Sequence, residues 1–355
     1  MFHDILFLLL GLVLLVFGAN YVTDGAVAVA KRFKVSHLII GLTVVALGST
    51  LPDMVVCVES AFENNPAMAI GEVMGSNIFD LLLVIGIMGI IRPWKVSGVM
   101  RYQDLPILLI ASGALWVAGD TVLFDGLDHN VVNRSAGIML IVIFIFYMWF
   151  MILSSKNEKT VSASEMEEGA NEDVESQSAK AGIVSSHSIK SDLSVLKMEV
   201  SELRKKQWFS WLMIVAGLGA LVIGGNWVVD GASGLALKIG MSQGMVALTV
   251  VAIGNALPDL VTSVTATVKG ASGIALGNIV GSCIINSLLS VGLSALVIPL
   301  TADTIGFVDF ITLVGASALI WFVPLLSKGK SVTRLFGCIL VALYIGYMVF
   351  TVIRG

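Results

Sequence analysis

The stretch Gly48-Ser49-Thr50-Leu51-Pro52-Asp53 places a carboxylate inside an otherwise apolar run from Ser36 to Ala61. A charge in the middle of a membrane helix costs about 3 kcal/mol or more unless it faces a protein interior or a cation. The same chemistry returns as Gly254-Asn255-Ala256-Leu257-Pro258-Asp259. Two buried acids in matching settings indicate a shared function.

The composition is that of a polytopic membrane protein. Hydrophobic residues make up 57% of the 355 residues and charged residues 13%, and the mean hydropathy is +0.94, which is too apolar for a soluble core. The first apolar run has no basic n-region and exceeds signal-peptide length, so we expect it to be a retained helix. Cys57, Cys283 and Cys338 all lie in apolar segments, which predicts neither disulfides nor a zinc site. No basic stripe suggests nucleic-acid binding.

Apolar windows of about 20 residues predict an all-α protein of ten transmembrane helices. A polar segment rich in Ser, Glu and Lys separates the fifth helix from the sixth. The chain is therefore predicted to contain a first five-helix half at 1–153, a largely disordered cytoplasmic linker at 154–206 and a second five-helix half at 207–355. The predicted helices cover 4–29, 36–62, 67–91, 104–119, 134–153, 208–237, 242–267, 272–298, 306–326 and 332–352.

The distribution of Lys and Arg predicts that both termini lie outside and that the central segment is cytoplasmic. Three basic residues fall in the outward loops and ends, namely Lys238, Arg134 and Arg354. Ten fall in the short inward loops: Lys31, Arg32, Lys34, Arg92, Lys95, Arg101, Lys269, Lys328, Lys330 and Arg334. The absence of an Arg-rich transit segment favours a prokaryotic cell membrane over an organelle.

The two halves are an internal duplication. A shift of 206 residues aligns 18–86 with 224–292 without a gap, and 27 of the 69 positions are identical. Because each half has an odd number of predicted helices, the second half must enter the membrane from the opposite side. Inverted repeats indicate a transporter with its binding site near the midplane, between two equivalent halves.

Each repeat carries two polar stretches into the membrane. Pro52 removes a backbone donor, so we expect a break near Ser49 to Pro52 that exposes carbonyls around Ala46. The second stretch, Gly75 to Asp80, corresponds to Gly281 to Asn286. If all four stretches meet, the pocket offers only oxygen ligands from carboxylates, an amide, hydroxyls and carbonyls. Such a set favours hard cations such as Ca²⁺ or Na⁺.

These four stretches resemble the paired alpha-repeats of the calcium/cation antiporter superfamily, and in particular the sodium/calcium exchangers. The resemblance covers both repeats and the ten-helix arrangement. It implies that the first and sixth helices slide across a rigid core, that three Na⁺ move against one Ca²⁺ and that no resident cofactor or obligate protein partner is needed. By resemblance the first half supplies the Ala46 carbonyl, Ser49, Thr50, Asp53, Ser76 and Asp80. The second half supplies the Ala252 carbonyl, Asn255, Asp259, Ser282 and Asn286.

The sequence departs from that family pattern at three points. Many members have Glu after the proline, whereas this chain has Asp53 and Asp259. The usual Thr-Ser of the second repeat is replaced by Asn255-Ala256, which is similar to exchangers of the mitochondrial sodium/lithium/calcium type. Asp80 and Asn286 occupy the opposite repeats from some members.

Three carboxylates would be neutralised by three Na⁺, or by one Ca²⁺ and one proton on Asp80.

Other polar residues have structural interpretations. We expect Asp24 and Asp230 to belong to helix ends, and Glu72, whose repeat partner is Asn278, to be more often structural than functional. A calcium sensor in the central segment is disfavoured because an EF-hand pattern is lacking. A solvated linker is favoured there despite an acidic cluster of Glu165, Glu167, Glu168, Glu172, Asp173 and Glu175.

Three other functions are compatible with buried acids in membrane helices. An intramembrane aspartyl protease would need a Gly-x-Gly-Asp motif, which is absent. A channel is disfavoured because broken inverted helices around one site favour alternating access. The nearest alternative is an antiporter of the same superfamily that couples to protons or K⁺, or that tolerates Li⁺. The prediction is a non-enzymatic Na⁺/Ca²⁺ antiporter that extrudes Ca²⁺.

Overall fold

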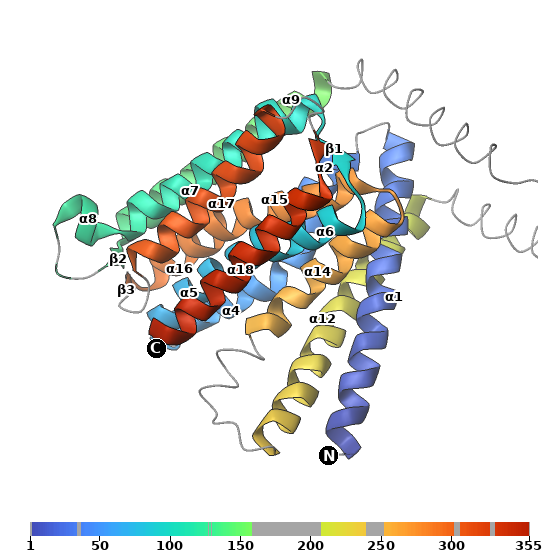
Figure 1. The fold of residues 1–355 in the computed structure, drawn as a ribbon, viewed down its shortest axis with the longest axis horizontal. Helices are drawn as coiled ribbons and strands as arrows, with labels where there is room; N and C mark the ends of the chain where they lie inside the picture. Colours follow the sequence, from blue (N-terminus) through green and yellow to red (C-terminus); the bar gives the residue numbers. More distant parts are fainter. Residues whose placement is uncertain are drawn as a thin grey trace, which may run out of the picture.

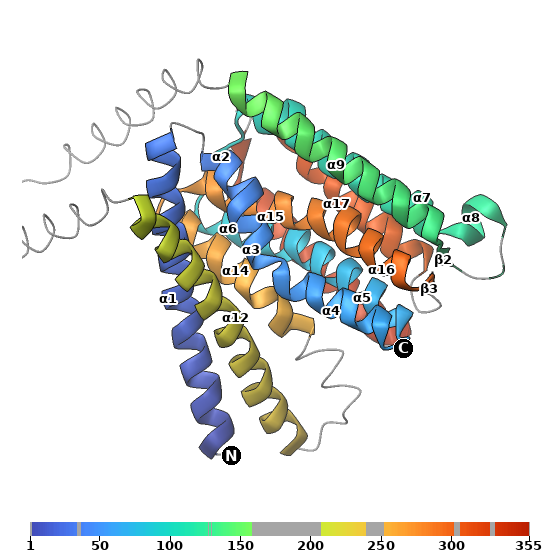
Figure 2. The ribbon, with the colours of Figure 1, turned by 180° about the vertical axis from the view of Figure 1, so that it is seen from behind.

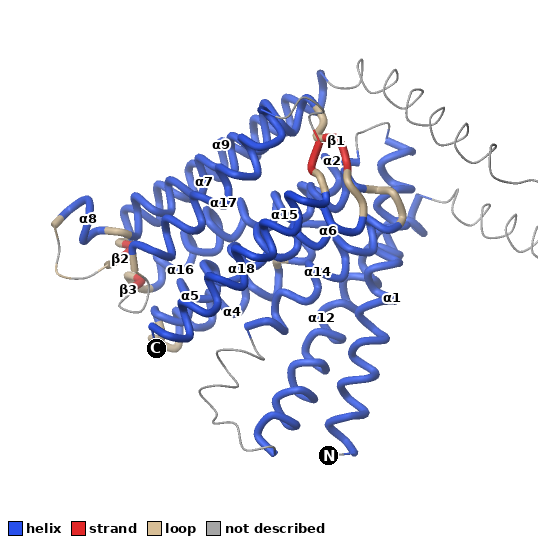
Figure 3. The backbone as a smooth tube through the Cα atoms, viewed as in Figure 1, coloured by secondary structure: helices blue, strands red, loops and turns tan. Residues whose placement is uncertain are grey.

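The fold was analysed in a computed structural model, which describes residues 2–33, 37–126, 128, 130–157, 207–238, 252–301, 306–326 and 331–354. The linker predicted at 154–206 lies outside the described residues apart from its first four positions, which extend a helix. The described chain is helical, with two short two-stranded sheets. Figure 3 shows these strands away from the middle of the helical body.

The helices of the first half follow the predicted spans closely. The long helices are α1 (Phe2–Phe33) and α9 (Arg134–Asn157). Between them lie α2 (His37–Ile40), a π-helical turn (Gly41–Val45), α3 (Ala46–Ser49), α4 (Leu51–Phe62), α5 (Pro66–Ile78), a π-helical turn (Phe79–Val84), α6 (Ile85–Ile91), β1 (Trp94–Lys95), a π-helical turn (Met100–Asp104), α7 (Leu105–Gly119), α8 (Thr121–Asp125) and β2 (Val131–Val132).

The second half repeats this plan. It contains α12 (Gln207–Lys238), α14 (Ala252–Val268), α15 (Ser272–Ile285), a π-helical turn (Asn286–Ser290), α16 (Val291–Val297), β3 (Leu300–Thr301), α17 (Phe307–Leu326), β4 (Ser331–Val332) and α18 (Arg334–Arg354). Both central π-helical turns begin within one residue of a predicted ligand, Asp80 or Asn286. Such turns are frequent at functional sites because they redirect side chains within a helix.

The described helices account for most, but not all, of the predicted spans by length. Seven are long and apolar enough to cross a membrane, and the bent pair His37–Ser49 with Leu51–Phe62 makes an eighth. The 15 residues of α7 and the described 17 residues of α14 are shorter than these. The amino-terminal part of the predicted helix 242–267 lies outside the described residues.

The expected break in the first repeat is present at Thr50, where α3 and α4 meet at 45°. The Ala46 carbonyl is not left free by this break, because it accepts hydrogen bonds from the Thr50 N–H at 3.0 Å and from the Thr50 hydroxyl at 2.6 Å. In the second repeat, α14 passes Pro258 without interruption. The helix is therefore broken near the proline of the first repeat and continuous through the equivalent proline of the second.

The repeat partners α1 and α12 lie against each other and run in opposite directions (Figures 1 and 2). A Cβ added to Gly11 would meet the Gly224 carbonyl at 2.7 Å, and one added to Gly18 would meet the Gly217 carbonyl at 2.8 Å. As the residue number rises in one helix it falls in the other, which defines an antiparallel crossing. Small residues permit this close approach, and the pair extends away from the main helical body in both views.

Contacts elsewhere also join one half to the other. In the first sheet β1 pairs antiparallel with β4, and in the second β2 pairs antiparallel with β3, so each sheet takes one strand from each half. The buried core contains the middle of α5 and nearly the whole of α15. Arg101, which the sequence places among inward loop cations, is instead buried and donates to the Val96 carbonyl at 2.8 Å.

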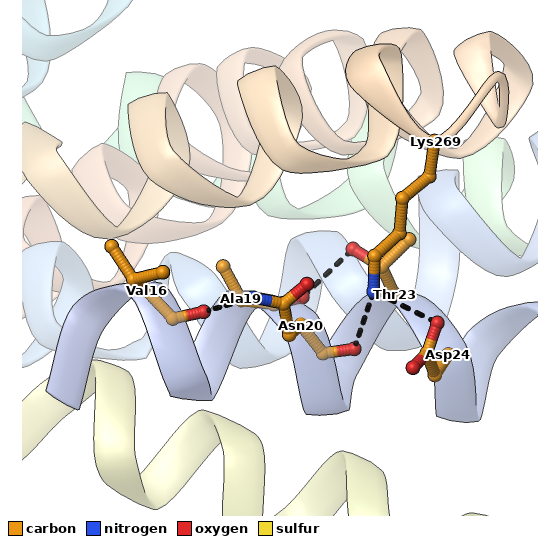
Figure 4. Close-up of polar contacts among 6 residues, drawn as sticks. All are labelled: Val16, Ala19, Asn20, Thr23, Asp24 and Lys269. Carbon is orange, nitrogen blue, oxygen red and sulfur yellow. Dashed lines mark hydrogen bonds and ion pairs between the residues drawn. The ribbon is translucent and has the colours of Figure 1, made fainter. Parts of the chain in front are cut away.

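A lysine at the end of α14 connects the core to α1 (Figure 4). The Lys269 ammonium lies 2.8 Å from the Asp24 carboxylate and donates to the Asn20 carbonyl at 3.3 Å. Asp4 and Lys238 form another ion pair between α1 and α12. Asp24 thus has a structural ion pair, but it lies inside α1, which continues to Phe33, so the predicted position at a helix end is wrong.

Candidate ion-binding site

Asp53 lies at the start of α4 and is bound to the second repeat through Asn286. The Asn286 amide donates to Asp53 Oδ2 at 3.0 Å and approaches the Ser76 hydroxyl at 3.4 Å. The Asn286 amide oxygen accepts from the Ser290 hydroxyl at 3.2 Å. Asp53 and Asn286 are 2% and 0% exposed, so this contact lies in the protein interior. The first and fourth predicted stretches are thereby brought together.

Asp259 lies on α14 and is bound by a different amide. Asn278 of α15 donates to Asp259 Oδ1 and to the Ser263 hydroxyl, each at 3.1 Å. Ser49 donates to the Asn278 amide oxygen at 2.9 Å. Asn278 therefore joins the Pro-Asp stretch of one repeat to that of the other, and all of these side chains are buried.

Asp80 completes the cluster from the π-helical turn after α5. Its carboxyl faces that of Asp259, and neither the two Asp80 oxygens nor the Ser282 hydroxyl has a hydrogen-bond partner. A contact between two carboxyl groups is a hydrogen bond only when one of them carries a proton. Asn286 bonds to both Asp53 and Ser76, and Asn278 links Ser49 to Asp259, so all four predicted stretches meet at the interface of the repeats.

The remaining predicted ligands lie around this centre. Thr50 is buried and its hydroxyl bonds to the Ala46 carbonyl, so that carbonyl could bind a cation only if the hydroxyl turned away. Asn255 donates to Glu72 Oε1 at 3.0 Å instead of to an aspartate. The backbone of Ala252 begins α14.

Several buried oxygens of the centre have no protein donor. They are Asp53 Oδ1, both carboxylate oxygens of Asp80, Asn77 Oδ1 and Ser282 Oγ. Buried acceptors without partners are costly in a membrane interior. Hard cations satisfy such oxygens. In the described part of the chain, no three Asp, Glu, His or Cys side chains are arranged to hold one metal by themselves, so amides and hydroxyls must contribute to any ion site.

Two residues at the centre were not assigned to it from the sequence. Asn278 contacts both Ser49 and Asp259, and Asn77 of α5 donates to the Ser287 hydroxyl at 2.9 Å and to the Cys283 carbonyl at 3.4 Å. Asn278 could have been found because it is the repeat partner of Glu72, which the sequence does single out. Asn77 has Cys283 as its repeat partner and gives no comparable signal.

Comparison with known proteins identifies the family. The family model described as sodium/calcium exchanger protein matches residues 3–153 and 209–353. The chain belongs to the sodium/calcium exchanger family. The resemblance inferred from the two repeats is thus confirmed, and the protein is an integral membrane transport protein of this exchanger family.

Individual relatives cover nearly the whole chain. The sodium/calcium exchanger MaX1 of Methanosarcina acetivorans is 28% identical, with 98% of this chain and 97% of the relative aligned. The putative antiporter CaxA of Alkalimonas amylolytica is 29% identical, with 96% of each chain aligned. Among solved structures, the sodium-calcium exchanger NCX_Mj soaked with 10 mM Na⁺ and zero Ca²⁺ aligns with a TM-score of 0.75 at 26% identity, over 98% of each chain.

Proposed function

We propose that this exchanger is a secondary antiporter that moves Na⁺ inward and Ca²⁺ outward across a cell membrane. The central observation is that both Pro-Asp stretches meet at one buried centre, where Asp53 Oδ1 and both Asp80 oxygens have no protein donor. Oxygens of this kind suit Na⁺ and Ca²⁺. MaX1 and NCX_Mj are named as sodium/calcium exchangers, which supports the same pair of ions here.

The predicted ligands are proposed in full as the ion-binding set. They comprise Asp53, Asp80, Asp259, Asn286, Ser49, Thr50, Asn255, Ser76, Ser282 and the carbonyls of Ala46 and Ala252. Asn278 is added as the residue that positions Asp259 and Ser49, because it is hydrogen-bonded to both. No chemical step is required of any of them, since ion exchange needs only binding, desolvation and release.

We assign the sliding movement that gives alternating access to the helix pair α1 and α12. These helices contact each other through glycines over much of their length, and both pack against α14. A smooth glycine-lined contact lets the two move as a unit. Ten membrane spans, both termini outside and a cytoplasmic central segment complete the proposed topology.

The deciding experiment is radiolabelled calcium uptake into proteoliposomes under separately imposed Na⁺, K⁺, Li⁺ and pH gradients. We expect uptake to require an outward Na⁺ gradient and to be abolished when that gradient is collapsed. Uptake driven only by a pH gradient would contradict sodium coupling and favour the proton-coupled alternative. Flux that needs no opposing gradient would contradict antiport and favour a channel.

A further inference from the structure

Glu72 lies on α5 one helical turn before Ser76 and two turns before Asp80, on the side of the helix that leads to the centre. It is partly buried, and its Oε1 accepts a hydrogen bond from Asn255 of α14 at 3.0 Å. The contact joins two residues 183 positions apart, one from each repeat. Glu72 is therefore built into the interface of the repeats and is not a loop charge.

The same contact exists on the other side of the pseudo-symmetric centre with different residues. Asn255 corresponds to Ser49 and Glu72 corresponds to Asn278 under the shift of 206 residues. The Ser49 hydroxyl bonds to Asn278 at 2.9 Å, as Asn255 bonds to Glu72 at 3.0 Å. The repeats differ at both positions of the pair, so the hydrogen bond is kept while one side has a carboxyl group in place of an amide.

Because Glu72 stands where the other repeat has Asn278, Asp53 lacks a hydrogen-bond donor equivalent to the one that Asp259 has. Asn278 gives an N–H to Asp259 at 3.1 Å. Glu72 in the equivalent place has no N–H to give as a carboxylate, and the repeat symmetry that sets Asn278 beside Asp259 sets Glu72 on the Asp53 side of the centre. Asp53 is 2% exposed, and its Oδ1 has no partner. Two neighbouring carboxylates in a membrane interior need positive charge that no described side chain at this point supplies.

We propose that Asp53 and Glu72 form an additional cation-binding position for one monovalent metal cation. Together with Asp80 and Asp259, they give the ion-binding centre four carboxylates. The unpartnered Asp53 Oδ1, the Glu72 carboxylate and the Asn255 amide oxygen are its ligands. Two carboxylates attract the cation, and the Asn255 N–H orients Glu72 toward it. The proposal extends the proposed transport function, but cation binding at this position is measurable without transport.

The test counts ions bound to the purified full-length protein. Equilibrium binding of ²²Na⁺, and separately of ⁸⁶Rb⁺ as a K⁺ analogue, is compared between wild type and the double variant Glu72→Asn with Asn255→Ser. That variant installs the Ser–Asn pair which already fits at Ser49 and Asn278, so the hydrogen bond is retained and folding is preserved. We expect the double variant to bind about one monovalent cation fewer per protein with one of the two isotopes.

Two further variants make the result decisive. Glu72→Asp retains the charge and is expected to bind the wild-type number of ions with weaker affinity. Glu59→Gln removes an exposed carboxylate from α4 and is expected to change nothing. Equal ion counts and affinities for wild type and the double variant, with both isotopes, would overturn the proposal. Wild-type protein that binds the extra ion but does not exchange Ca²⁺ would contradict the proposed transport function alone.

Discussion

The two repeats place the same backbone around the same centre but give it different charge. On one side, Ser49 bonds to Asn278, which in turn donates to Asp259. On the other, Asn255 bonds to Glu72, and Asp53 takes its amide donor from Asn286 instead. Duplicated halves can therefore preserve a hydrogen bond while their charges differ. The asymmetry noticed in the sequence between Ser49-Thr50 and Asn255-Ala256 is thus one half of a paired change.

Removing either Pro-Asp carboxylate tests whether the two repeats contribute equally to ion binding. Asp53→Asn and Asp259→Asn each delete a buried charge that faces the centre. The loss of one partner of a buried charged interaction costs about 3 kcal/mol or more, which is roughly 100-fold in affinity. We expect both variants to lose Na⁺-dependent calcium uptake in proteoliposomes by at least that factor. Glu63→Gln, at an exposed position, is the control, and equal uptake by an aspartate variant and this control would refute the assignment.

Breaking the two pseudo-equivalent pairs should give unequal effects. Asn255→Ala leaves the Glu72 carboxylate without its donor, and hydrogen bonds to charged groups contribute about 1.5–3 kcal/mol, or roughly 10- to 100-fold in affinity. Ser49→Ala removes a donor from the neutral Asn278 amide, which is worth about 1 kcal/mol, or roughly fivefold. We expect the apparent Na⁺ affinity to fall further in Asn255→Ala. A larger loss of Na⁺ affinity in Ser49→Ala than in Asn255→Ala would show that the charge of Glu72 does not contribute to Na⁺ binding.

Asp80 and Asn286 are the second place where the repeats differ. The amide of Asp80→Asn can donate to Asp259 as a protonated carboxyl would, so we expect the Ca²⁺ affinity to change by no more than about threefold, equivalent to roughly 0.6 kcal/mol. Because one negative charge is lost, the steepness of the Na⁺ dependence should decrease. Both quantities are read from radiolabelled calcium binding in competition with Na⁺. Complete loss of Ca²⁺ binding would mean that Asp80 is ionised in the calcium-loaded state.

The smallest effect is expected at the link between α14 and α1. Lys269 and Asp24 are partly exposed, with side chains 30% and 34% accessible, and ion pairs of this kind contribute about 0–1 kcal/mol. Lys269→Ala should therefore leave the ion affinities of the purified protein unchanged and lower its thermal unfolding midpoint slightly. Lys269→Arg, which keeps the charge, is the matched control. A large change in ion affinity would mean that the link controls access to the centre.

The sequence predicted the helical spans because each carries a continuous apolar window. It also predicted the four polar stretches, because a carboxylate or amide in such a window has to be compensated. The break at Thr50 was predicted from Pro52, which cannot supply the N–H that would continue the helix. Because α14 passes the equivalent Pro258 unbroken, proline alone does not determine the break. What the sequence missed was the role of Asn278, because an amide in an apolar helix is as readily structural as functional until its neighbours are known.

By itself, then, the sequence determined the duplication, the inverted arrangement it implies and the residues that carry charge into the membrane. These are properties of local hydropathy and of internal alignment, which need no knowledge of packing. The hydrogen-bond partners are visible only in the folded protein: Asp53 with Asn286, Asp259 with Asn278, and Glu72 with Asn255. Two of these contacts join residues at least 183 positions apart, and the third joins neighbouring helices of one repeat. Such choices depend on how the helices pack against one another, within a repeat and between repeats, which no local pattern encodes.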